Sequence, residues 1–187
     1  MIYFYDIFER AFNLFSDPDI DQKYYNDQAG FQSDMLDFLI IGKDKFTSPV
    51  AITDKLIICA QPEGYMESDS GDGSDTYVLE RQVANGGIGV GFTYVIGKEK
   101  VFGSYDPETN SVIFPRAINS DETWAVSWFY AGAFTADFSD CLRSDFPMDA
   151  IMEKVITILA YALCSAWGDK EVGRVLEVRN ILTDTDF

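Results

Sequence analysis

The apolar residues of this chain follow a helical period at its two ends and a strand period between them. The first helical stretch carries Ile7, Phe8, Ala11, Phe12 and Phe15. Their spacing of three or four residues places them on one face of a helix. From Val50 onward the apolar residues alternate with polar ones or form short β-branched runs, which is typical of strands. The sequence therefore predicts helical segments at both ends and a β segment in the middle.

Two helices are expected before residue 50. The first begins at Phe4 and ends at Ser16-Asp17-Pro18-Asp19, because a proline disfavours the helical conformation of the residue before it. The second begins at Asp27, a suitable N-cap, and ends at Thr47-Ser48-Pro49. Its apolar side holds Phe31, Met35, Phe38, Leu39, Gly42 and Phe46. A link of about ten residues predicts that the two helices pack antiparallel with their apolar faces together.

Short strands are expected in the middle segment. Residues 105–110, with the sequence Tyr-Asp-Pro-Glu-Thr-Asn, have the composition of a hairpin turn. In residues 123–130, Trp124, Val126, Trp128 and Tyr130 share one face, which indicates a half-buried strand. Five or six such runs, with turns about every ten residues, predict a small antiparallel sandwich or barrel.

A helical pattern resumes near residue 145. Asp145 is the expected cap, and Pro147 occupies the first turn. An apolar stripe at helical spacing continues from Met148 to Ala166. Gly168 is expected to break or kink this helix before a last one, and residues 182–187 to form an extended tail.

Each helical end carries an apolar stripe that it cannot bury alone. We therefore expect an α+β fold in which the N- and C-terminal helices form one bundle with a small antiparallel β-sandwich or barrel inserted between them. Residues 1–50 and 145–187 would form the helical domain. Residues 51–144 would form the inserted β domain.

Composition excludes several kinds of function. The 187 residues include no His, and 31 Asp and Glu oppose 14 Lys and Arg, which gives a net charge of −17. Catalysis by Ser-His-Asp or Cys-His and imidazole-dependent zinc sites are therefore excluded. The acidic balance also disfavours binding to a phosphate backbone. We expect a protein that is not an enzyme and holds no cofactor and no metal.

The cysteines and the apolar runs indicate where such a chain is made. Cys59, Cys141 and Cys164 form no C-x-x-C pair, and Cys59 and Cys164 are expected to be small buried residues in a chain made in a reducing cytoplasm. The start of the chain has no basic region of the kind that precedes a secretory signal. The longest weakly charged run, Val155 to Trp167, is too short to cross a bilayer, so no membrane segment is expected.

Two segments could in principle hold a ligand. Residues 85–91 are rich in glycine but precede an apolar β run instead of a helix, so a flexible loop or a bulged strand is favoured over a phosphate site. Residues 63–75 hold five acidic residues that could bind calcium, although the spacing of an EF-hand is absent. A mobile, solvated loop is the favoured interpretation of that segment, and calcium binding is left open.

Aromatic residues near the N-terminus and in the last strands exceed what one core face can bury. Tyr3, Phe4 and Tyr5 are consecutive and point around a helix, so some of them must meet another subunit or partner. The same argument applies to Trp128, Phe129 and Phe134. These six residues are the candidate oligomer or partner interface.

The order of segments resembles the neck proteins of tailed bacteriophages, the head-to-tail connector or ring proteins, such as those of crAss-like phages. The resemblance lies in LFSDPDI, in YYNDQAGFQSDMLDFLIIGKDKF, in the strand pair YDPETNSVIFP and WAVSWFYAGAF, and in the C-terminal segment from residue 151. It implies a structural virion protein, made in the host cytoplasm, that forms a ring, commonly twelve-fold, between portal and tail. The implied partners are copies of itself, the portal and other neck or tail proteins, while DNA passes through the ring without specific binding. Family members carry no catalytic residues, so none is expected here.

Two other functions remain as alternatives. The charge of −17 would suit an acidic DNA mimic that inhibits a host nucleic-acid-binding protein. The Trp-containing β unit and the acidic segment would suit a module that binds carbohydrate or calcium.

Overall fold

The computed structural model describes residues 1–15, 17–47, 49–135, 137–138 and 147–184, with the backbone alone for 178–184. The helices are α1 (Phe4–Phe12), α2 (Pro18–Asn26), α3 (Gln28–Lys45), α4 (Val50–Thr53) and α5 (Met148–Asp184), with one 3₁₀ turn, η1 (Ala84–Gly87). The strands are β1 (Ile2–Tyr3), β2 (Ile58–Ala60), β3 (Glu63–Ser70), β4 (Thr76–Val78), β5 (Val90–Ile96), β6 (Glu99–Val101), β7 (Ser104–Asp106), β8 (Ser111–Ile113), β9 (Thr123–Tyr130) and β10 (Ala133–Phe134). The chain is therefore mixed α+β, and its paired strands run antiparallel.

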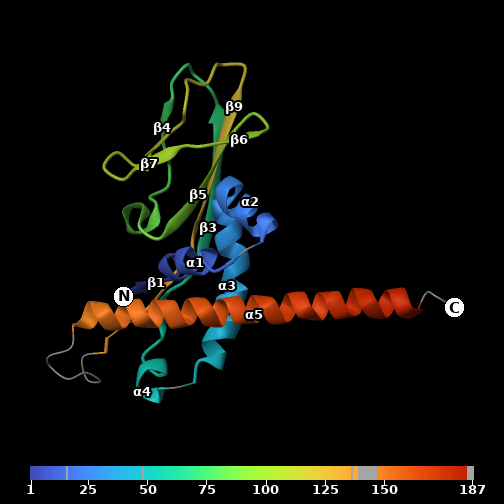
Figure 1. The fold of residues 1–187 in the computed structure, drawn as a ribbon. Coiled ribbons are helices and arrows are strands. Elements are labelled where there is room, and N and C mark those ends of the chain that lie inside the picture. The colour runs from blue at the N-terminus through green and yellow to red at the C-terminus, as the bar shows by residue number, and fades with distance from the viewer. Residues whose placement is uncertain (16, 48, 136, 139–146, 185–187) are drawn as a thin grey trace.

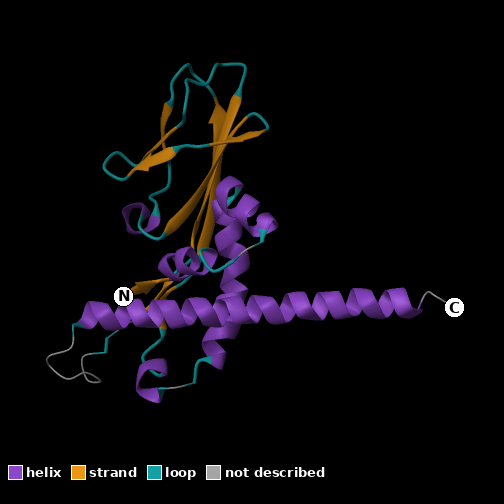
Figure 2. Cartoon of the chain, in the orientation of Figure 1, coloured by secondary structure: helices purple, strands orange, loops and turns teal. Residues whose placement is uncertain are grey.

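The long helix α5 lies across the base of the molecule, and the strands rise from it on one side (Figures 1 and 2). Helix α3 crosses α5 and continues up to the sheet, while α4 lies on the opposite side of α5. The C-terminal half of α5 extends beyond every other element. The molecule thus has a body built around the α3–α5 crossing and a projecting helical arm.

The strands form three sheets in the described part of the chain, with the orders β3-β9-β5-β6, β4-β8-β7 and β1-β10-β2. In β9 the alternation expected from sequence is confirmed, because Trp124, Val126, Trp128 and Tyr130 are all buried. Their apolar cluster also takes in residues of the second sheet, among them Val112 of β8. One core therefore joins the four-stranded sheet to the sheet β4-β8-β7.

The hairpin turn expected at residues 105–110 is confirmed. Strands β7 and β8 pair on either side of it, with Tyr105 opposite Val112. Asn110 has a φ of 53°, a left-handed conformation that asparagine tolerates. Its buried side-chain amide donates to the carbonyl oxygens of Leu79 and Arg81, each at 2.9 Å. The turn is thus tied to the chain that follows β4.

The helical core forms where α1, α3 and α5 meet. Its fully buried members include Phe4, Ile7, Phe8, Ala11, Phe31, Leu39, Leu159 and Leu163. Four residues of the segment expected to form the β domain belong to the same cluster: Leu56, Ala131, Phe134 and Phe138. The N- and C-terminal helices therefore share one interior, as expected, and this interior also takes in β10 and the chain before β2.

The crossing of α3 and α5 depends on Gly42. A Cβ built on this glycine would lie 2.6 Å from the carbonyl carbon of Ala162 and 2.8 Å from the nitrogen of Leu163. A Cβ atom does not make non-bonded contacts this short, so the two backbones can approach this closely only because residue 42 has no side chain. Because α3 crosses α5 instead of running beside it, the arrangement differs from a bundle of parallel or antiparallel helices.

The N-terminal end of α3 docks on the four-stranded sheet. The side chain of Asp27 accepts a hydrogen bond from the backbone of Gly30 at 3.1 Å, so the cap expected from sequence is confirmed. Gln32 is buried, and with its amide suitably oriented it donates to the carbonyl of Phe129 and accepts from the backbone nitrogen of Gly91, both at 3.0 Å. The helix is thereby bonded to two neighbouring strands, β5 and β9.

Three elements differ from the sequence-based expectation. Helix α2 was not expected, because Asp17-Pro18 was interpreted only as the end of the first helix. Asp17 in fact caps α2 by accepting from the backbone of Asp19 at 2.9 Å, and Pro18 occupies the first helical position, where no backbone donor is needed. Val50–Thr53 forms helix α4 instead of strand. Segment 63–75, expected to be a mobile loop, contains strand β3, which pairs with β9 along its whole length.

The C-terminal helix also differs from expectation. Helix α5 continues without interruption from Met148 to Asp184, so the break expected at Gly168 and the extended tail expected from residue 182 are both wrong over the described residues. A single glycine costs a helix about 1 kcal/mol relative to alanine, which the flanking helical turns can offset. The expected cap Asp145 lies outside the described residues.

Replacing Gly42 by alanine should destabilise the fold. The added methyl group would press on the backbone of α5 at Ala162, and overpacking of this kind costs about 1–3 kcal/mol. Gly173→Ala is the matched control, because nothing lies within 4 Å of a Cβ at this helical position. We expect it to raise the free energy of unfolding by up to about 1 kcal/mol. Urea unfolding of both variants measures the difference, and equal stabilities would contradict the role given to Gly42.

Acid should weaken the end of the sheet that Glu122 stabilises. Arg116 donates to both carboxylate oxygens of Glu122 at 2.6 and 2.8 Å, and Asn119 adds a backbone hydrogen bond at 3.2 Å. These bonds, that from Arg116 first, lower the pKa of Glu122 from its ordinary 4.5 to about 2. Since the folded-state pKa is depressed, the stabilisation is complete above the ordinary pKa and is lost as the pH falls towards the folded value.

The variant Glu122→Gln should therefore be less stable than the wild type at neutral pH. Between about pH 5 and pH 2 its stability should fall less steeply than that of the wild type, because it has no carboxylate to protonate at this position. Glu80→Gln changes another exposed glutamate and leaves the Arg116–Glu122 pair intact, so it should keep the wild-type slope. Thermal unfolding followed across this pH range distinguishes the two. Identical profiles for Glu122→Gln and the wild type would show that the ion pair does not contribute.

Candidate functional site

The structure places three of the six expected interface residues inside the protomer. Phe4, Trp128 and Phe134 are each at most 1% exposed, so these three cannot meet a partner. The ring centroids of Phe4 and Phe134 lie 4.5 Å apart, because β1, which directly precedes Phe4, pairs with β10, which contains Phe134. Trp128 lies in the separate core beneath the four-stranded sheet. The interface prediction is wrong for these residues.

The other three residues, Tyr3, Tyr5 and Phe129, are partly exposed. Tyr5 lies beside Glu9, whose carboxylate accepts a hydrogen bond from the hydroxyl of Tyr24. Burial, with the hydrogen bond and charge of Glu9, raises the pKa of Tyr5 to about 12. Its phenol therefore stays protonated at neutral pH, which fits a packing role better than acid–base chemistry.

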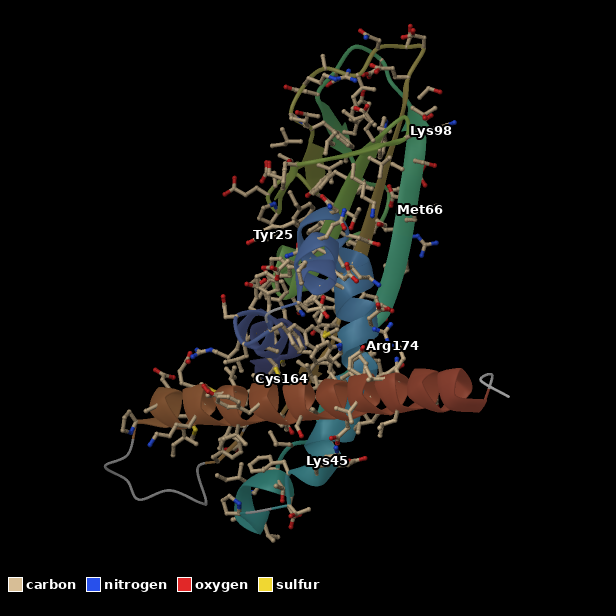
Figure 3. The ribbon with its side chains drawn as sticks, turned by 45° about the vertical axis from the view of Figure 1, so that its right-hand side comes forward. Tyr25, Lys45, Met66, Lys98, Cys164 and Arg174 are labelled. Atoms are coloured by element: carbon tan, nitrogen blue, oxygen red, sulfur yellow. The ribbon has the colours of Figure 1, made fainter. Side chains whose placement is uncertain are left out.

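The N-terminal half of α5 presents one face to the body. Val155, Leu159 and Leu163 are at most 1% exposed and pack against α1 and α3. Beside this face, the thiol of Cys164 points to the carbonyl oxygen of Ala11 at 3.8 Å. Burial raises the pKa of this thiol to about 11. Figure 3 shows Cys164 near the middle of the helix and Arg174 on the projecting half.

The opposite face of α5 carries apolar residues that the described part of the chain leaves largely exposed. We define the α5 stripe as Ile158, Tyr161, Ser165, Gly168, Val172 and Val175, which succeed one another at intervals of three and four residues. Its four large side chains are 42%, 59%, 61% and 64% exposed in that order. A helix with apolar residues on all sides is ordinarily buried on all sides. The α5 stripe is therefore the strongest candidate for a contact surface.

This surface was not predicted from the sequence, for an identifiable reason. The apolar face expected for the helix ran from Met148 to Ala166 and ended at the expected break at Gly168. With the helix continuous, Val172 and Val175 fall on the same face as Ile158 and Tyr161, on the side away from the body. The three-four spacing across Gly168 was the signal that could have found it.

Helix α5 is long and apolar enough to cross a membrane by length and composition. Within Met148–Glu177, a window of 18 residues has a mean hydropathy of 1.4, and 33% of that window is buried in the protomer. The weakly charged run Val155–Trp167, which the sequence indicated to be too short to cross a bilayer, is only part of this helix. The high hydropathy has two sources, the face that packs on α1 and α3 and the α5 stripe.

A groove of about 640 Å³ follows the other side of the projecting half of α5, between it and helices α2 and α3. Asp34 and Asp37 line it, together with Phe38 and Trp167. Lys170 of α5 lies over the ring of Phe38 at 5.0 Å. Lys23 pairs with Asp34, so cations of this chain already neutralise part of the acidic lining.

The acidic segment 63–75 is not arranged as a cation site. The carboxylate of Glu67 accepts hydrogen bonds from the backbone nitrogens of Glu80 and Arg81 at 2.9 and 3.0 Å, which ties β3 to the chain after β4. Among the residues that the structure describes, no group of three or more Asp, Glu or Cys side chains could hold a metal ion. Met66 on β3 points away from the sheet and is exposed (Figure 3).

The glycine-rich segment 85–91 forms the 3₁₀ turn η1 and the start of β5, instead of the flexible loop or bulged strand that was expected. Its backbone is left-handed at Asn85, Gly86, Gly87 and Gly89. At Gly87 a Cβ would lie 2.7 Å from the ring of Tyr105, so the turn packs closely on β7. No long helix begins here, so the dipole that would hold a phosphate is missing from this segment.

The expectation of two buried cysteines is wrong for one of them. Cys59 is exposed, because β2 is an edge strand of the sheet β1-β10-β2, while Cys164 is half-buried. Cys141 lies outside the described residues.

A scan against protein-family models found no match. Searches of curated protein sequences and of solved structures also found no match.

The two described cysteines should differ in reactivity. At pH 8 the thiolate fraction of Cys164 should be about a hundredfold smaller than that of a thiol with the ordinary pKa, while exposed Cys59 is open to reagent. Iodoacetamide labelling followed by peptide mass spectrometry resolves each cysteine separately. We expect Cys59 to be modified first and Cys164 only at high pH or after unfolding. Equal labelling rates in the folded protein would show that Cys164 is not protected.

Proposed function

We propose that this protein is a structural component that assembles with copies of itself, as a ring in the neck of a tailed bacteriophage between portal and tail. The observation that carries the assembly part of the proposal is the α5 stripe, which leaves Tyr161, Val172 and Val175 more than half exposed. A large apolar face is covered in the functional state of most proteins, and a further protein surface is the usual cover. The neck location rests on the resemblance of the sequence.

A protein partner accounts for the stripe better than a lipid surface does. Helices that lie on membranes carry Lys and Arg on their polar face, which attract anionic lipids. The polar residues of α5 are mixed in charge, because Glu153, Asp169, Glu171 and Glu177 stand beside Lys154, Lys170 and Arg174, so the helix lacks a purely basic polar face. The whole chain carries a charge of −17. An anionic bilayer would repel such a surface.

The acidic surface also fits a part that DNA passes without being held. A wall of net negative charge repels the phosphate backbone, whereas affinity for DNA requires clustered Lys and Arg. Several cations of this chain are paired with carboxylates, including Arg10 with Glu153 and Lys45 with Asp169 at 2.6 and 2.5 Å. Pairs of this kind place positive charges among the carboxylates, which suits a DNA mimic less well than an unbroken acidic face.

The finer architecture belongs to the same proposal. We infer that the crossing helices α1, α3 and α5 act as the connector domain, and that the two sheets sharing the Trp124–Tyr130 core act as an inserted sandwich. This division supports a ring in which the helical base makes the contacts between copies and the β unit faces other neck or tail proteins.

Mass spectrometry of purified virions tests the location. We expect this chain in particles, at a copy number that matches the symmetry of the portal, and we expect the portal to co-purify with a tagged copy. Absence from particles would end the neck proposal. Recovery of a host nuclease or repressor in place of the portal would favour the DNA mimic.

A charge on the α5 stripe should weaken self-association. Val175→Lys places an ammonium group in the apolar face, and burying it against a partner would cost several kcal/mol. Val78→Lys is the matched control, because Val78 is also exposed, at 70%, but lies on β4 away from α5. Light scattering across a concentration series should show a loss of association of about tenfold or more for Val175→Lys alone. Equal behaviour of the two variants would show that the stripe makes no contact between copies.

A further inference from the structure

The α5 stripe has a symmetry that its individual residues do not show. The intervals between its six members are three, four, three, four and three residues, so the spacing is the same in both directions along the helix. The two residues with little or no side chain, Ser165 and Gly168, lie at the centre, and two apolar side chains flank them on each side. Repeats of three and four residues are those by which two helices pack along a shared seam.

We propose that the α5 stripe is covered by the α5 stripe of a second copy, packed antiparallel about a two-fold axis between residues 165 and 168. In this register Ile158 meets Val175 of the second copy and Tyr161 meets Val172. Ser165 meets Gly168 at the centre, where a Cβ on Gly168 would have no neighbour within 4 Å among the described residues. The inference rests on the proposed self-assembly and specifies its contact.

The antiparallel direction follows from the sizes of the side chains. It sets the larger residues Ile158 and Tyr161 against the smaller valines, so every layer of the contact has a similar volume. A parallel pair would place Tyr161 against its own copy and Val172 against its own copy, which leaves one layer overfilled and another loose. Antiparallel helices also place each positive dipole end beside a negative one.

The projecting arm gives a second reason. The half of α5 that carries Val172 and Val175 extends beyond the body, whereas the half that carries Ile158 and Tyr161 is backed by α1 and α3. In an antiparallel pair each projecting half lies along the half of the other copy that α1 and α3 back. Both arms would then be covered at once.

The area is sufficient for a specific contact. Four large side chains, each exposed by about half, and the neighbouring Leu176, which is also exposed, contribute on the order of 100 Å² apiece, or about 500 Å² from each copy. Pairing would remove about 1,000 Å² in total, which is the lower limit for a specific interface.

A two-fold contact closes after two copies, so a ring would need a second contact of another kind. The antiparallel pair would then be the building unit, and the number of copies would be even. An assembly of twelve copies would contain six such pairs and would repeat six times around the ring.

Disulfide trapping between two single-cysteine variants tests the register. The background carries Cys59→Ser, Cys141→Ser and Cys164→Ala, and Ile158→Cys and Val175→Cys are made separately in it with tags of different mass. In the antiparallel pair residue 158 lies opposite residue 175, within the range that a disulfide spans, whereas residue 158 lies about 25 Å from its own copy. Circular dichroism and thermal unfolding confirm that each variant is folded.

We expect the mixture of Ile158→Cys and Val175→Cys to give about tenfold more mixed disulfide dimer on mild oxidation than either variant gives by itself. A mixture of Val78→Cys with Val175→Cys measures random collision and should give little product. Dimers of Ile158→Cys with itself at the same yield would indicate a parallel pair and overturn the proposal. No product above the collision control would also overturn it.

Two further measurements separate this inference from the proposed function. If light scattering shows an oligomer while trapping fails, copies associate through another surface, and the neck proposal survives without this contact. Flotation with vesicles of phosphatidylcholine and phosphatidylglycerol should leave the protein unbound. Binding that Val175→Lys abolishes would assign the stripe to a lipid surface and overturn the antiparallel pair.

Discussion

The close approach of two helical backbones at Gly42 is the constraint on which the rest of the structure depends. Because residue 42 has no side chain, α3 crosses α5 in direct contact with Ala162, and the apolar residues of both helices close around this point. The crossing leaves α3 free to reach the sheet at one end and leaves half of α5 outside the body. Parallel packing of the same helices would have buried more of α5 and left less of it exposed.

The aromatic residues near the N-terminus show how pairing of strands changes what a pattern means. Three consecutive aromatics on a helix must point in different directions, which was the reason to expect an interface there. In the structure Tyr3 belongs to strand β1, and Phe4 begins α1 with its backbone nitrogen donating to the carbonyl of Gly132 at 3.0 Å. The aromatic pair Phe4–Phe134 is therefore a long-range contact inside the core, which no local period can reveal.

Much of the secondary structure follows from local signals, and the exceptions have physical causes. The cap at Asp27, the turn ending at Asn110 and the buried side of β9 were all predictable, because each depends on residues within one element. The start of α2 was missed because Asp17-Pro18 ends one helix and begins another with the same residues. The exposed side of α5 was missed because the helix was expected to break at Gly168, which separated Val172 and Val175 from the face that carries Ile158 and Tyr161. Periodicity identifies such a face, but it does not say which faces the rest of the chain covers.

The hydrogen bonds of Gln32 have a mechanical consequence. They fix one end of α3 to β5 and β9, while Gly42 seats the same helix on α5 about fifteen ångströms further along its axis. Helix α3 therefore joins the sheet to the long helix at the base as one continuous element. A displacement of the sheet relative to α5 would have to break these hydrogen bonds, separate the backbones at Gly42 or bend α3 between them.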